Sequence, residues 1–384
     1  MRVMELSLGP GMSDTLGTMR IPAVGVIGCG DIAQKSYLPS LAGELRRLGK
    51  LAAVCDVVPA RAEKCGKKYR VPAFTDVRAM LRRADLDAVV ILTPLLTHPR
   101  FARMAINARL NAYTEKPLAA TVREADALVR LARRRRVVLA SAPSASVTPL
   151  VREARRLIRA GVIGKPCLIR AHSSHGGPGG VWNTDYSWVY RRNISGPIPP
   201  IYDMGIYGLS TLTALLGPAK RVSALAGLAI SPRKIEVAGR KPYWLKPTGL
   251  DNAFLLIDYG NARLAALDAS YCLRESEGWP IEVFGSDGAM SLSAWGNKLR
   301  VCSHRGAAGL PRGRWADRRV NPGPVSGFVK GVAHFLECLG KRREPENGGD
   351  FSRHLVDIME SAIRSAATGR TVKLRTSFDW RKMR

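Results

Sequence analysis

The chain has 384 residues, of which 46% are hydrophobic, so it is long enough for two domains that each bury a core. No stretch approaches the roughly 18 consecutive apolar residues of a membrane-spanning helix, so we predict no membrane partner. The formal net charge is +29, but the basic residues are scattered and accompany no known nucleic-acid motif, so we also predict no specific nucleic-acid partner.

The seven cysteines are widely spaced and include no C-x-x-C pair, which argues against a disulfide framework and against a zinc site. We therefore predict no metal site, and a reducing cytoplasm is the simplest location for such a chain. Residues 1–20 contain no signal-peptide pattern and are predicted to form a disordered leader.

The first predicted element is a buried strand over residues 23–28, an apolar run bounded by glycines. It leads into the turn Gly28-Cys29-Gly30-Asp31-Ile32-Ala33, which has the pattern G-x-G-x-x-A and precedes a helical stretch. In such a turn the first glycine permits a tight bend and the second lets the backbone approach a pyrophosphate, while the helix offers free N–H groups to anionic oxygens. The predicted dinucleotide contacts are Gly28, Gly30, Asp31 and Ile32.

The second predicted strand, residues 51–56, ends in Asp56. An acid at this position accepts hydrogen bonds from the adenosine ribose and repels a 2′-phosphate, which favours NAD over NADP. NADP stays open as an alternative, because Asp56 could simply cap the helix that begins near Pro59 and because Arg61 lies close by.

The strand and helix pattern then repeats. A buried strand over residues 88–93 is followed by a helix over about 98–108 and by a short strand that leads to Glu115-Lys116-Pro117. A capping box at 121–124 starts another helix, and the last strand covers 137–140. This alternation predicts a doubly wound parallel sheet, the Rossmann dinucleotide-binding arrangement, over residues 21–145. Lys116 would point into the same crevice as the dinucleotide.

The second half of the chain has a different pattern. A helix over 148–160 is followed by strands with no helices between most of them, at 166–171, 222–230, 252–258, 262–270, 281–284 and 299–303. Strands joined by short turns predict an antiparallel sheet. Two helices near 327–339 and 351–368 close this substrate-binding and oligomerisation domain, which we place at residues 146–375, before a tail at 376–384.

Residues 173–201 form a long segment rich in glycine and aromatic residues, a composition typical of a lid or binding loop. The flat faces of Trp182 and Tyr190 could cover a sugar ring, and Arg191 could hold its oxygens, so we predict that these three residues contact the substrate. The alternative is that the aromatic side chains anchor the loop on the sheet.

Asp203 and Tyr207 lie four residues apart at the start of a predicted apolar helix and share one helical face. A phenol has an unperturbed pKa of about 10, too high for an efficient base at neutral pH, and a nearby lysine would lower it. We predict that Tyr207 exchanges the proton of a substrate hydroxyl, that Lys116 positions this hydroxyl, and that Asp203 orients or polarises one of them. The alternative is that Tyr207 is a core residue of an amphipathic helix.

Together these segments resemble the Gfo/Idh/MocA family of NAD(P)-dependent oxidoreductases over residues 21–375. The resemblance rests on the glycine turn, on Thr93-Pro94 with His98, on Glu115-Lys116-Pro117 and on residues 203–207. It implies a Rossmann domain followed by an α/β domain with an open, mostly antiparallel sheet, and a cis Lys116–Pro117 peptide. It also implies contact of Lys116 with both nicotinamide and substrate, and a cofactor site that includes Thr93, Pro94, His98 and Glu115.

Three positions depart from the family pattern. Tyr207 stands where many members have histidine. A tyrosine at this position resembles the branch of glucose–fructose oxidoreductase and dimeric dihydrodiol dehydrogenase. Ser210 replaces a common aspartate, and Leu95 replaces the asparagine that usually follows Thr-Pro. The acid/base role therefore transfers to Tyr207, whereas the substrate does not.

The predicted function is transfer of hydride between the nicotinamide of NAD(P) and a carbon that bears a hydroxyl or carbonyl on a sugar, cyclitol or related compound. Two alternatives stay open, namely redox-neutral glycoside cleavage or epimerisation with recycled NAD, and a non-catalytic NAD(P)-binding sensor. A large apolar sheet face needs covering, and the family resemblance points the same way, so we predict a homodimer or homotetramer.

Overall fold

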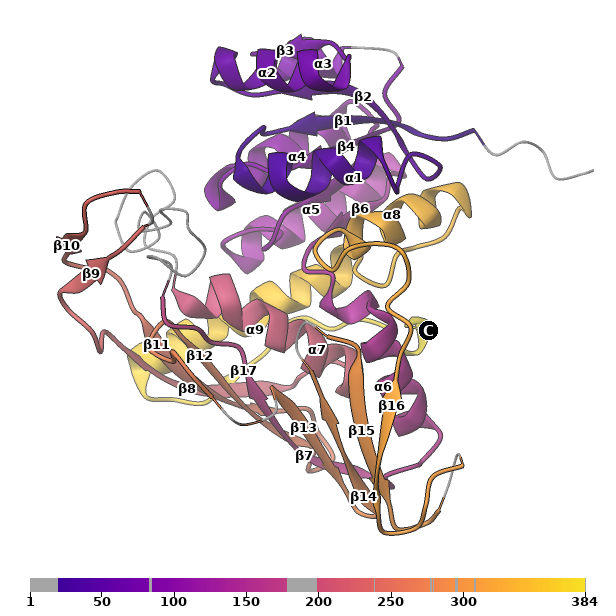
Figure 1. The fold of residues 1–384 in the computed structure, drawn as a ribbon, viewed down its shortest axis with the longest axis vertical. Helices are drawn as coiled ribbons and strands as arrows, with labels where there is room; N and C mark the ends of the chain where they lie inside the picture. The colour runs from indigo at the N-terminus through magenta and orange to yellow at the C-terminus, as the bar shows by residue number, and fades with distance from the viewer. Residues whose placement is uncertain are drawn as a thin grey trace, which may run out of the picture.

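The computed structural model describes residues 20–82, 85–177, 199–237, 239–276, 278, 280–293, 296–306 and 309–383. Figure 1 shows a small sheet with its helices at the top, a large second sheet at the bottom, and a layer of helices between them. The prediction of an α/β fold with two different sheets is confirmed.

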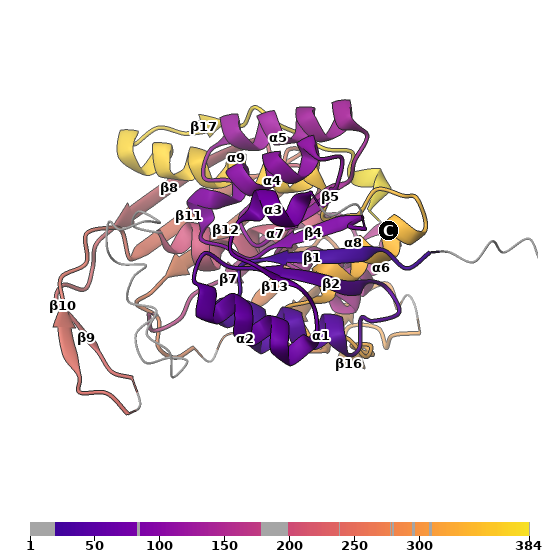
Figure 2. The same ribbon diagram turned by 90° about the horizontal axis from the view of Figure 1, so that it is seen from above.

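The first sheet has six parallel strands in the order β3-β2-β1-β4-β5-β6. These strands are β1 Ala23–Ile27, β2 Lys50–Cys55, β3 Ala73–Phe74, β4 Ala88–Ile91, β5 Asn111–Thr114 and β6 Leu139–Ser141. The helices are α1 Leu38–Ala42, α2 Pro59–Tyr69, α3 Val77–Leu81, α4 His98–Asn107 and α5 Val122–Arg135, and a helical turn over Ala33–Tyr37 precedes α1. Figure 2 shows α1 and α2 on one face and α4 and α5 on the other, as predicted for a doubly wound sheet.

Local sequence explains these elements well. All four residues of β4 are buried, as expected for a central parallel strand covered on both faces. The predicted capping box is present: the Thr121 side chain accepts from the Glu124 backbone N–H, and the Glu124 carboxylate accepts from the Thr121 N–H. Helix α5 ends where Arg136 adopts the left-handed conformation.

The second sheet has nine strands in the order β16-β15-β14-β13-β7-β12-β11-β8-β17. The strands are β7 Pro166–His172, β8 Arg221–Gly227, β11 Asn252–Asp258, β12 Leu264–Ser270, β13 Ile281–Gly285, β14 Gly288–Leu292, β15 Lys298–Ser303, β16 Trp315–Arg319 and β17 Val372–Lys373. Only the β7–β12 pair is parallel, so the sheet is mostly antiparallel, as predicted.

A hairpin of β9 Arg233–Ile235 and β10 Tyr243–Leu245 projects beyond this sheet and has no counterpart in the predicted elements (Figure 1). The predicted strand over 222–230 also ends early, at Gly227. The backbone N–H groups of Ala229 and Ile230 donate to the carboxylate of Asp251, at 2.6 and 3.0 Å, instead of continuing the strand ladder.

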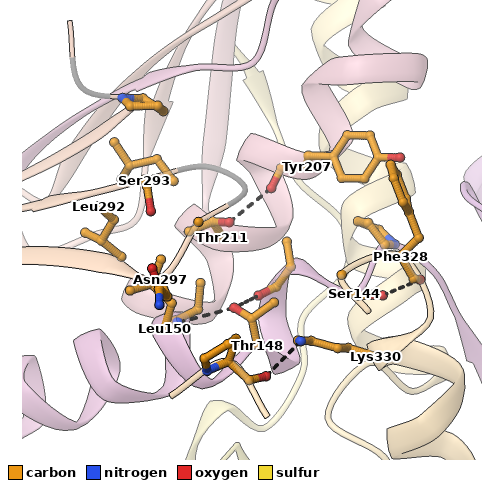
Figure 3. A pocket seen from close by; sticks show the side chains of 18 of the residues that line it. Ser144, Thr148, Leu150, Tyr207, Thr211, Leu292, Ser293, Asn297, Phe328 and Lys330 are labelled. Carbon is orange, nitrogen blue, oxygen red and sulfur yellow. Dashed lines mark hydrogen bonds between the residues drawn. The ribbon is translucent and has the colours of Figure 1, made fainter. Parts of the chain in front are cut away.

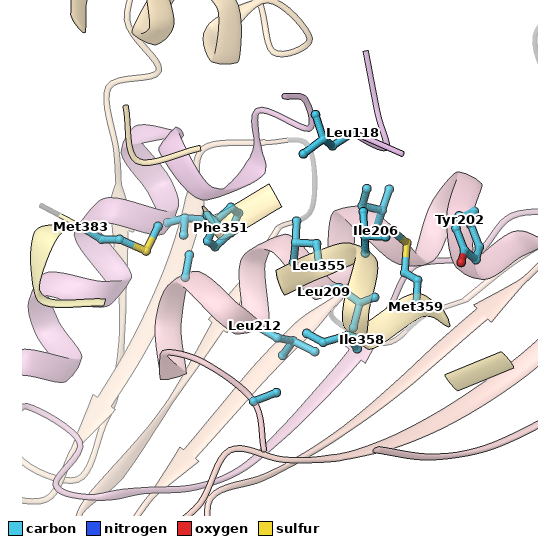
Figure 4. Close-up of a cluster of buried hydrophobic side chains, with 14 of the residues drawn as sticks. Leu118, Tyr202, Ile206, Leu209, Leu212, Phe351, Leu355, Ile358, Met359 and Met383 are labelled. Carbon is cyan, nitrogen blue, oxygen red and sulfur yellow. The ribbon is translucent and has the colours of Figure 1, made fainter. Parts of the chain in front are cut away.

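Three helices cover one face of the second sheet, namely α6 Pro149–Arg159, α7 Ile206–Leu216 and α9 Gly349–Thr368. Helix α8 Lys330–Gly340 packs instead in the core of the first sheet, with Val24 and Val26. Helices α7 and α9 pack through apolar side chains, shown in Figure 4, that include Leu209, Leu212, Leu355 and Ile358. Ten of the eleven residues of α7 are buried, and the exception is Tyr207. A helix so deeply embedded in the core holds its one partly exposed side chain in a fixed place.

Residues near the carboxyl end also pack against these helices. The Trp380 indole N–H donates to the carbonyl of Ala214 at 2.8 Å, and Arg159 donates to the carbonyl of Met383 at 2.6 Å. The predicted tail is thus part of the packed structure as far as residue 383. Within the part of the chain that the structure describes, no helix combines the length and apolar character needed to cross a membrane.

Candidate active site

The glycine turn has the space and conformation that a dinucleotide needs. Gly28 has φ +99°, and a Cβ there would lie 2.7 Å from the carbonyl oxygen of Leu92. A Cβ on Gly30 would meet nothing within 4 Å, so this side of the turn is open. The first glycine is therefore required by the backbone, and the second leaves room for a pyrophosphate to approach. These residues fit the predicted cofactor.

The two other turn residues predicted to contact the cofactor differ in setting. The Asp31 carboxylate pairs with Lys35 at 2.9 Å on the surface. Ile32 is partly buried against the core that includes Val24 and Val26. Contact of Asp31 and Ile32 with a dinucleotide stays a prediction.

Asp56 joins the glycine turn to helix α2. One carboxylate oxygen accepts from the N–H of Cys29 at 2.7 Å, and the other accepts from the N–H of Val58 at 2.8 Å. The second bond fixes Val58, the residue before α2, but the Asp56 side chain does not cap the helix itself, so the alternative reading of its position is not borne out. A carboxylate has about four acceptor sites, so these two bonds leave capacity for ribose hydroxyls, a contact that stays a prediction.

His98 connects the two loops that carry the remaining cofactor-site residues. Its Nε2 lies 2.7 Å from the carbonyl oxygen of Thr93, and its Nδ1 lies 2.8 Å from that of Pro117. Burial lowers the pKa of this imidazole, although the two carbonyls and Glu115 act in the opposite direction. A hydrogen bond from His98 to the cofactor ribose would have to replace one of these contacts. In this structure His98 therefore holds the loop at Thr93 to the loop at Pro117.

The Glu115-Lys116-Pro117 segment is fixed by the carboxylate of Glu115. One oxygen accepts from the hydroxyl of Tyr37 at 2.8 Å, and the other accepts from the N–H of Lys116 at 2.8 Å. The Lys116–Pro117 peptide is cis, as the family resemblance implied. Tyr37 lies in the helical turn after the glycine motif, so Glu115 ties the cofactor turn to the lysine.

Lys116 and Asp203 form an ion pair at the centre of the site. The Nζ of Lys116 donates to a carboxylate oxygen of Asp203 and to its backbone carbonyl, both at 2.7 Å. The side chains are only 15% and 22% exposed. Burial lowers the pKa of Lys116, but Asp203, Tyr207 and Glu115 outweigh this effect and raise it overall. Burial would also raise the pKa of Asp203, but Lys116 holds it below its ordinary value. Both groups are therefore charged at neutral pH.

Tyr207 lies beside this pair, with the Lys116 Nζ 5.1 Å from the centre of its ring. We predicted that the lysine would lower the pKa of the phenol. Burial is the larger effect, and with Glu115 and Asp203 it raises the pKa of Tyr207 although Lys116 acts in the lowering direction. The prediction of a net lowering is thus wrong, and the phenol is protonated at neutral pH.

A cavity of about 730 Å³ lies on the Tyr207 side of the site. This volume is within the range of about 300–1,000 Å³ that is usual for small-molecule sites. Figure 3 shows Tyr207 and Phe328 at one end and Ser293 and Asn297 across from them. Its other walls include Glu115, Ser144, Thr148, Leu150, Thr211, Leu292 and Lys330. Most polar wall groups are neutral hydroxyls and amides, which suits a hydroxylated ligand.

Sequence reasoning missed Tyr271, which follows strand β12. Its hydroxyl donates to the second carboxylate oxygen of Asp203 at 3.0 Å, and its ring is fully buried and lies 5.3 Å from the ring of His175. Arg233, from the unpredicted hairpin, donates to the Tyr271 carbonyl at 3.0 Å. The sequence holds no signal for this contact, since a tyrosine after an apolar strand reads as core.

Of the three departures from the family pattern, Leu95 and Ser210 are buried and Tyr207 is partly exposed. Leu95 is 8% exposed and belongs to the main hydrophobic core, and Ser210 is fully buried within α7. Three predicted substrate contacts, Trp182, Tyr190 and Arg191, lie outside the described residues. Among the residues that are described, no group of three or more His, Cys, Asp or Glu is placed to hold a metal ion.

Two family models match the chain. Residues 23–142 match the oxidoreductase family with an NAD-binding Rossmann fold, and residues 151–291 match the GFO/IDH/MocA C-terminal domain. The UDP-N-acetylglucosamine 3-dehydrogenase of Acidithiobacillus ferrooxidans is 30% identical, over 83% of this chain and 89% of that protein. The D-apiose dehydrogenase of Paraburkholderia graminis is 27% identical, over 85% of this chain and 84% of that protein.

Solved structures share the fold. The aldose-aldose oxidoreductase from Caulobacter crescentus, complexed with glycerol, superposes with a TM-score of 0.77 at 23% identity, over 92% of this chain and 100% of that chain. A levoglucosan dehydrogenase in complex with NADH and levoglucosan gives a TM-score of 0.76 at 19% identity, over 92% of this chain and 100% of that chain. At identities below 25%, these comparisons show that the fold is shared, which means the arrangement of both sheets.

Proposed function

Because the chain belongs to the GFO/IDH/MocA family of NAD-binding oxidoreductases, we propose that it transfers hydride between nicotinamide and a carbon bearing a hydroxyl or carbonyl on a sugar or cyclitol. The observation that carries this proposal is the position of Tyr207, which lines the cavity beside a lysine held by Asp203. The relatives named above act on free and nucleotide-linked sugars, which supports the substrate class.

Each of the three groups has a part in the proposed reaction. NAD, when bound, supplies the hydride acceptor or donor at the carboxyl ends of the first sheet. Lys116 donates a hydrogen bond to the substrate oxygen, and Asp203 keeps the ammonium charged and in place. Because the phenol of Tyr207 is protonated at neutral pH, it is ready to donate a proton to a carbonyl oxygen during reduction. In oxidation the phenolate must form first, and the adjacent Lys116 cation favours it.

The variant Tyr207→Phe tests this assignment. Loss of the acid/base group should lower kcat by about 10²–10⁴-fold, with NAD binding unchanged, in assays that follow reduced nicotinamide over a panel of sugars, cyclitols and uronates. Tyr202→Phe is the control, since the Tyr202 hydroxyl donates to the carbonyl of Ala120 at 2.9 Å, away from the reacting groups. Equal turnover by Tyr207→Phe and wild type would refute the role of Tyr207.

The same assay separates the alternative reactions. Product that forms without net reduction of NAD would support redox-neutral chemistry with a recycled cofactor. Binding of NAD without turnover of any compound would support a sensor. The neighbourhood of Asp56 supports a preference for NAD over NADP, and a comparison of the two cofactors in this assay measures it.

We also propose that the protein is a homodimer or homotetramer assembled through the open face of the second sheet. Four apolar side chains on neighbouring strands of this face are 49–77% exposed, namely Leu225, Phe254, Leu256 and Leu264. Contiguous apolar surface of this kind is usually covered by a partner. Light scattering after size-exclusion chromatography measures the assembly, and a monomer would contradict the proposal. The cytoplasmic location stays a prediction.

A further inference from the structure

A second cavity adjoins the one beside Tyr207. It has a volume of about 460 Å³, and it shares the wall residues Pro149 and Val320 with the first cavity. Its remaining wall residues come from helix α6 and from the end of strand β16, and they are Arg152, Glu153, Arg156, Arg318 and Arg319. We call this second cavity the arginine groove.

The carboxylate at the outer side of the groove is shared between two arginines. The two carboxylate oxygens of Glu153 accept from Arg156 at 2.7 and 2.8 Å. One of these oxygens also lies 3.4 Å from a guanidinium nitrogen of Arg318. The Arg156 side chain is 57% exposed and that of Arg318 is 32% exposed, so both can reach a ligand from solvent. One negative charge therefore faces two accessible guanidinium groups.

Arg152, another wall residue of the groove, pairs with a carboxylate that lies behind the wall. Glu346 divides its two oxygens between Arg152 and the buried Arg155, each at 2.6 Å. Arg152 also lies 3.3 Å from Nδ1 of the neighbouring His334, whose pKa is lowered to about 3 by burial and by Arg152 and other cations. Among the residues that line the groove, four are arginines, Arg152, Arg156, Arg318 and Arg319, and one is a carboxylate, Glu153.

The groove also has the directional chemistry that an anion requires. A guanidinium group offers five N–H donors in a planar fork that matches the oxygens of phosphate or carboxylate. Helix α6 begins at Pro149, at the junction of the two cavities, so the positive end of its dipole adds to the field of the arginines.

We propose that the arginine groove binds an anionic group of the substrate, a phosphate, a diphosphate or a carboxylate, while the reacting sugar ring lies against Tyr207. The inference rests on the proposed function, because it says where the anionic end of the same substrate binds. It narrows the substrate class to sugars that carry an acidic group away from the carbon that is oxidised.

Binding of inorganic pyrophosphate tests the groove without any turnover. Calorimetric titration is made in saturating NAD, which keeps the glycine turn occupied, and at about 0.15 M ionic strength, which screens the general attraction of a +29 protein. We expect saturable binding at one site per chain, weakened roughly tenfold or more in the double variant Arg156→Ala/Arg318→Ala. Unsaturable binding, or equal binding by both proteins, would overturn the groove as an anion site.

Arg221→Ala is the matched control, because the Arg221 side chain is 63% exposed and pairs with Asp258 at 2.7 Å, on a different strand. It removes one exposed, carboxylate-paired arginine, as each half of the double variant does. Pyrophosphate binding should be unchanged in the control. An equal loss in Arg221→Ala would show that only net charge matters and would overturn the proposal.

A kinetic comparison then identifies the anion. A sugar phosphate, the corresponding uronate and the neutral sugar are compared as substrates of wild type and of the double variant. We expect KM to rise roughly tenfold for the preferred anionic substrate, with kcat and the neutral sugar unaffected. An equal change for the neutral sugar would overturn the proposal. Absence of turnover in wild type would refute the dehydrogenase instead and leave the pyrophosphate result standing.

Discussion

Two buried ion clusters join distant parts of this chain, and they differ in their surroundings. Lys116 and Asp203, 87 positions apart, are 15% and 22% exposed and lie beside Tyr207, which lines a cavity. Arg155 and Glu346, 191 positions apart, are 1% and 5% exposed and lie among helices. The first pair meets a side chain that can exchange a proton with a ligand, whereas neither Arg155 nor Glu346 lines either of the two cavities. We infer that the first serves chemistry and the second serves stability.

The largest effect is expected in the structural cluster. Glu346→Gln removes the charge that two arginines share, so the free energy of unfolding should fall by about 3–5 kcal/mol, while kcat per folded molecule stays unchanged. Denaturant titration measures the loss. Glu153→Gln is the control, because Glu153 pairs with the exposed Arg156, and its loss should cost about 1 kcal/mol or less. Similar losses in both variants would break the comparison.

The catalytic cluster should respond in the opposite way. Lys116→Ala removes the cation that faces the substrate oxygen, so kcat should fall by about 10²–10³-fold, with NAD affinity changed by no more than a few-fold. Steady-state kinetics and NAD titration measure the two quantities. Lys234→Ala, which removes a surface lysine paired with Glu236, should keep full activity. Full activity in Lys116→Ala would mean that this pair, too, is structural.

His334, which lies beside the structural cluster, should also make the free energy of unfolding depend on pH. The pKa of His334 is about 3 in the folded protein, against about 6.5 for a free imidazole, because burial and nearby cations disfavour its charged form. Stability is therefore full above pH 6.5 and is lost as the pH falls from 6.5 toward 3, because only the unfolded state takes up the proton. His334→Asn should reduce the loss between pH 6.5 and 4 by about 2 kcal/mol. His354, whose folded pKa is about 4, accounts for part of the remaining loss, and an unchanged slope would show that His334 does not contribute.

The smallest effect is expected at Tyr271, which acts through Asp203. Tyr271→Phe removes one hydrogen bond to a buried carboxylate, so kcat should fall roughly tenfold, while KM for NAD stays constant. Tyr259→Phe is a matched control, since this fully buried tyrosine lies 3.2 Å from the Thr213 hydroxyl, and it should reduce stability without lowering kcat. A loss of kcat shared by both variants would assign Tyr271 to packing alone.

Local patterns predicted much of the fold and part of the site. The first sheet could be predicted because buried parallel strands are apolar runs and because a turn such as Gly28-Cys29-Gly30 has a backbone requirement that sequence shows. Lys116 was found at the carboxyl end of a predicted strand, and Asp203 and Tyr207 were found by their spacing of four residues. The family resemblance then supported their roles, and the structure brings all three together.

What the sequence could not predict depends on contacts between distant segments. Tyr271 reaches Asp203 only because strand β12 ends beside the helical turn Ile201–Gly205 that precedes α7, and no local pattern encodes that. The net rise in the pKa of Tyr207 depends on how deeply the phenol is buried, a property of the assembled core. Arg155 and Glu346 read as ordinary surface residues until helix α6 packs against the turn that precedes α9.

Helix α7 carries Tyr207 on an otherwise buried surface, and this has an evolutionary consequence. A substitution that shifts the helix would disturb ten core positions at once, so selection on stability also preserves the location of the phenol. The walls of the cavity that come from loops, such as Ser293, Asn297 and Phe328, are free of this constraint. The shape of the cavity can therefore change through its loops while Tyr207 stays where it is.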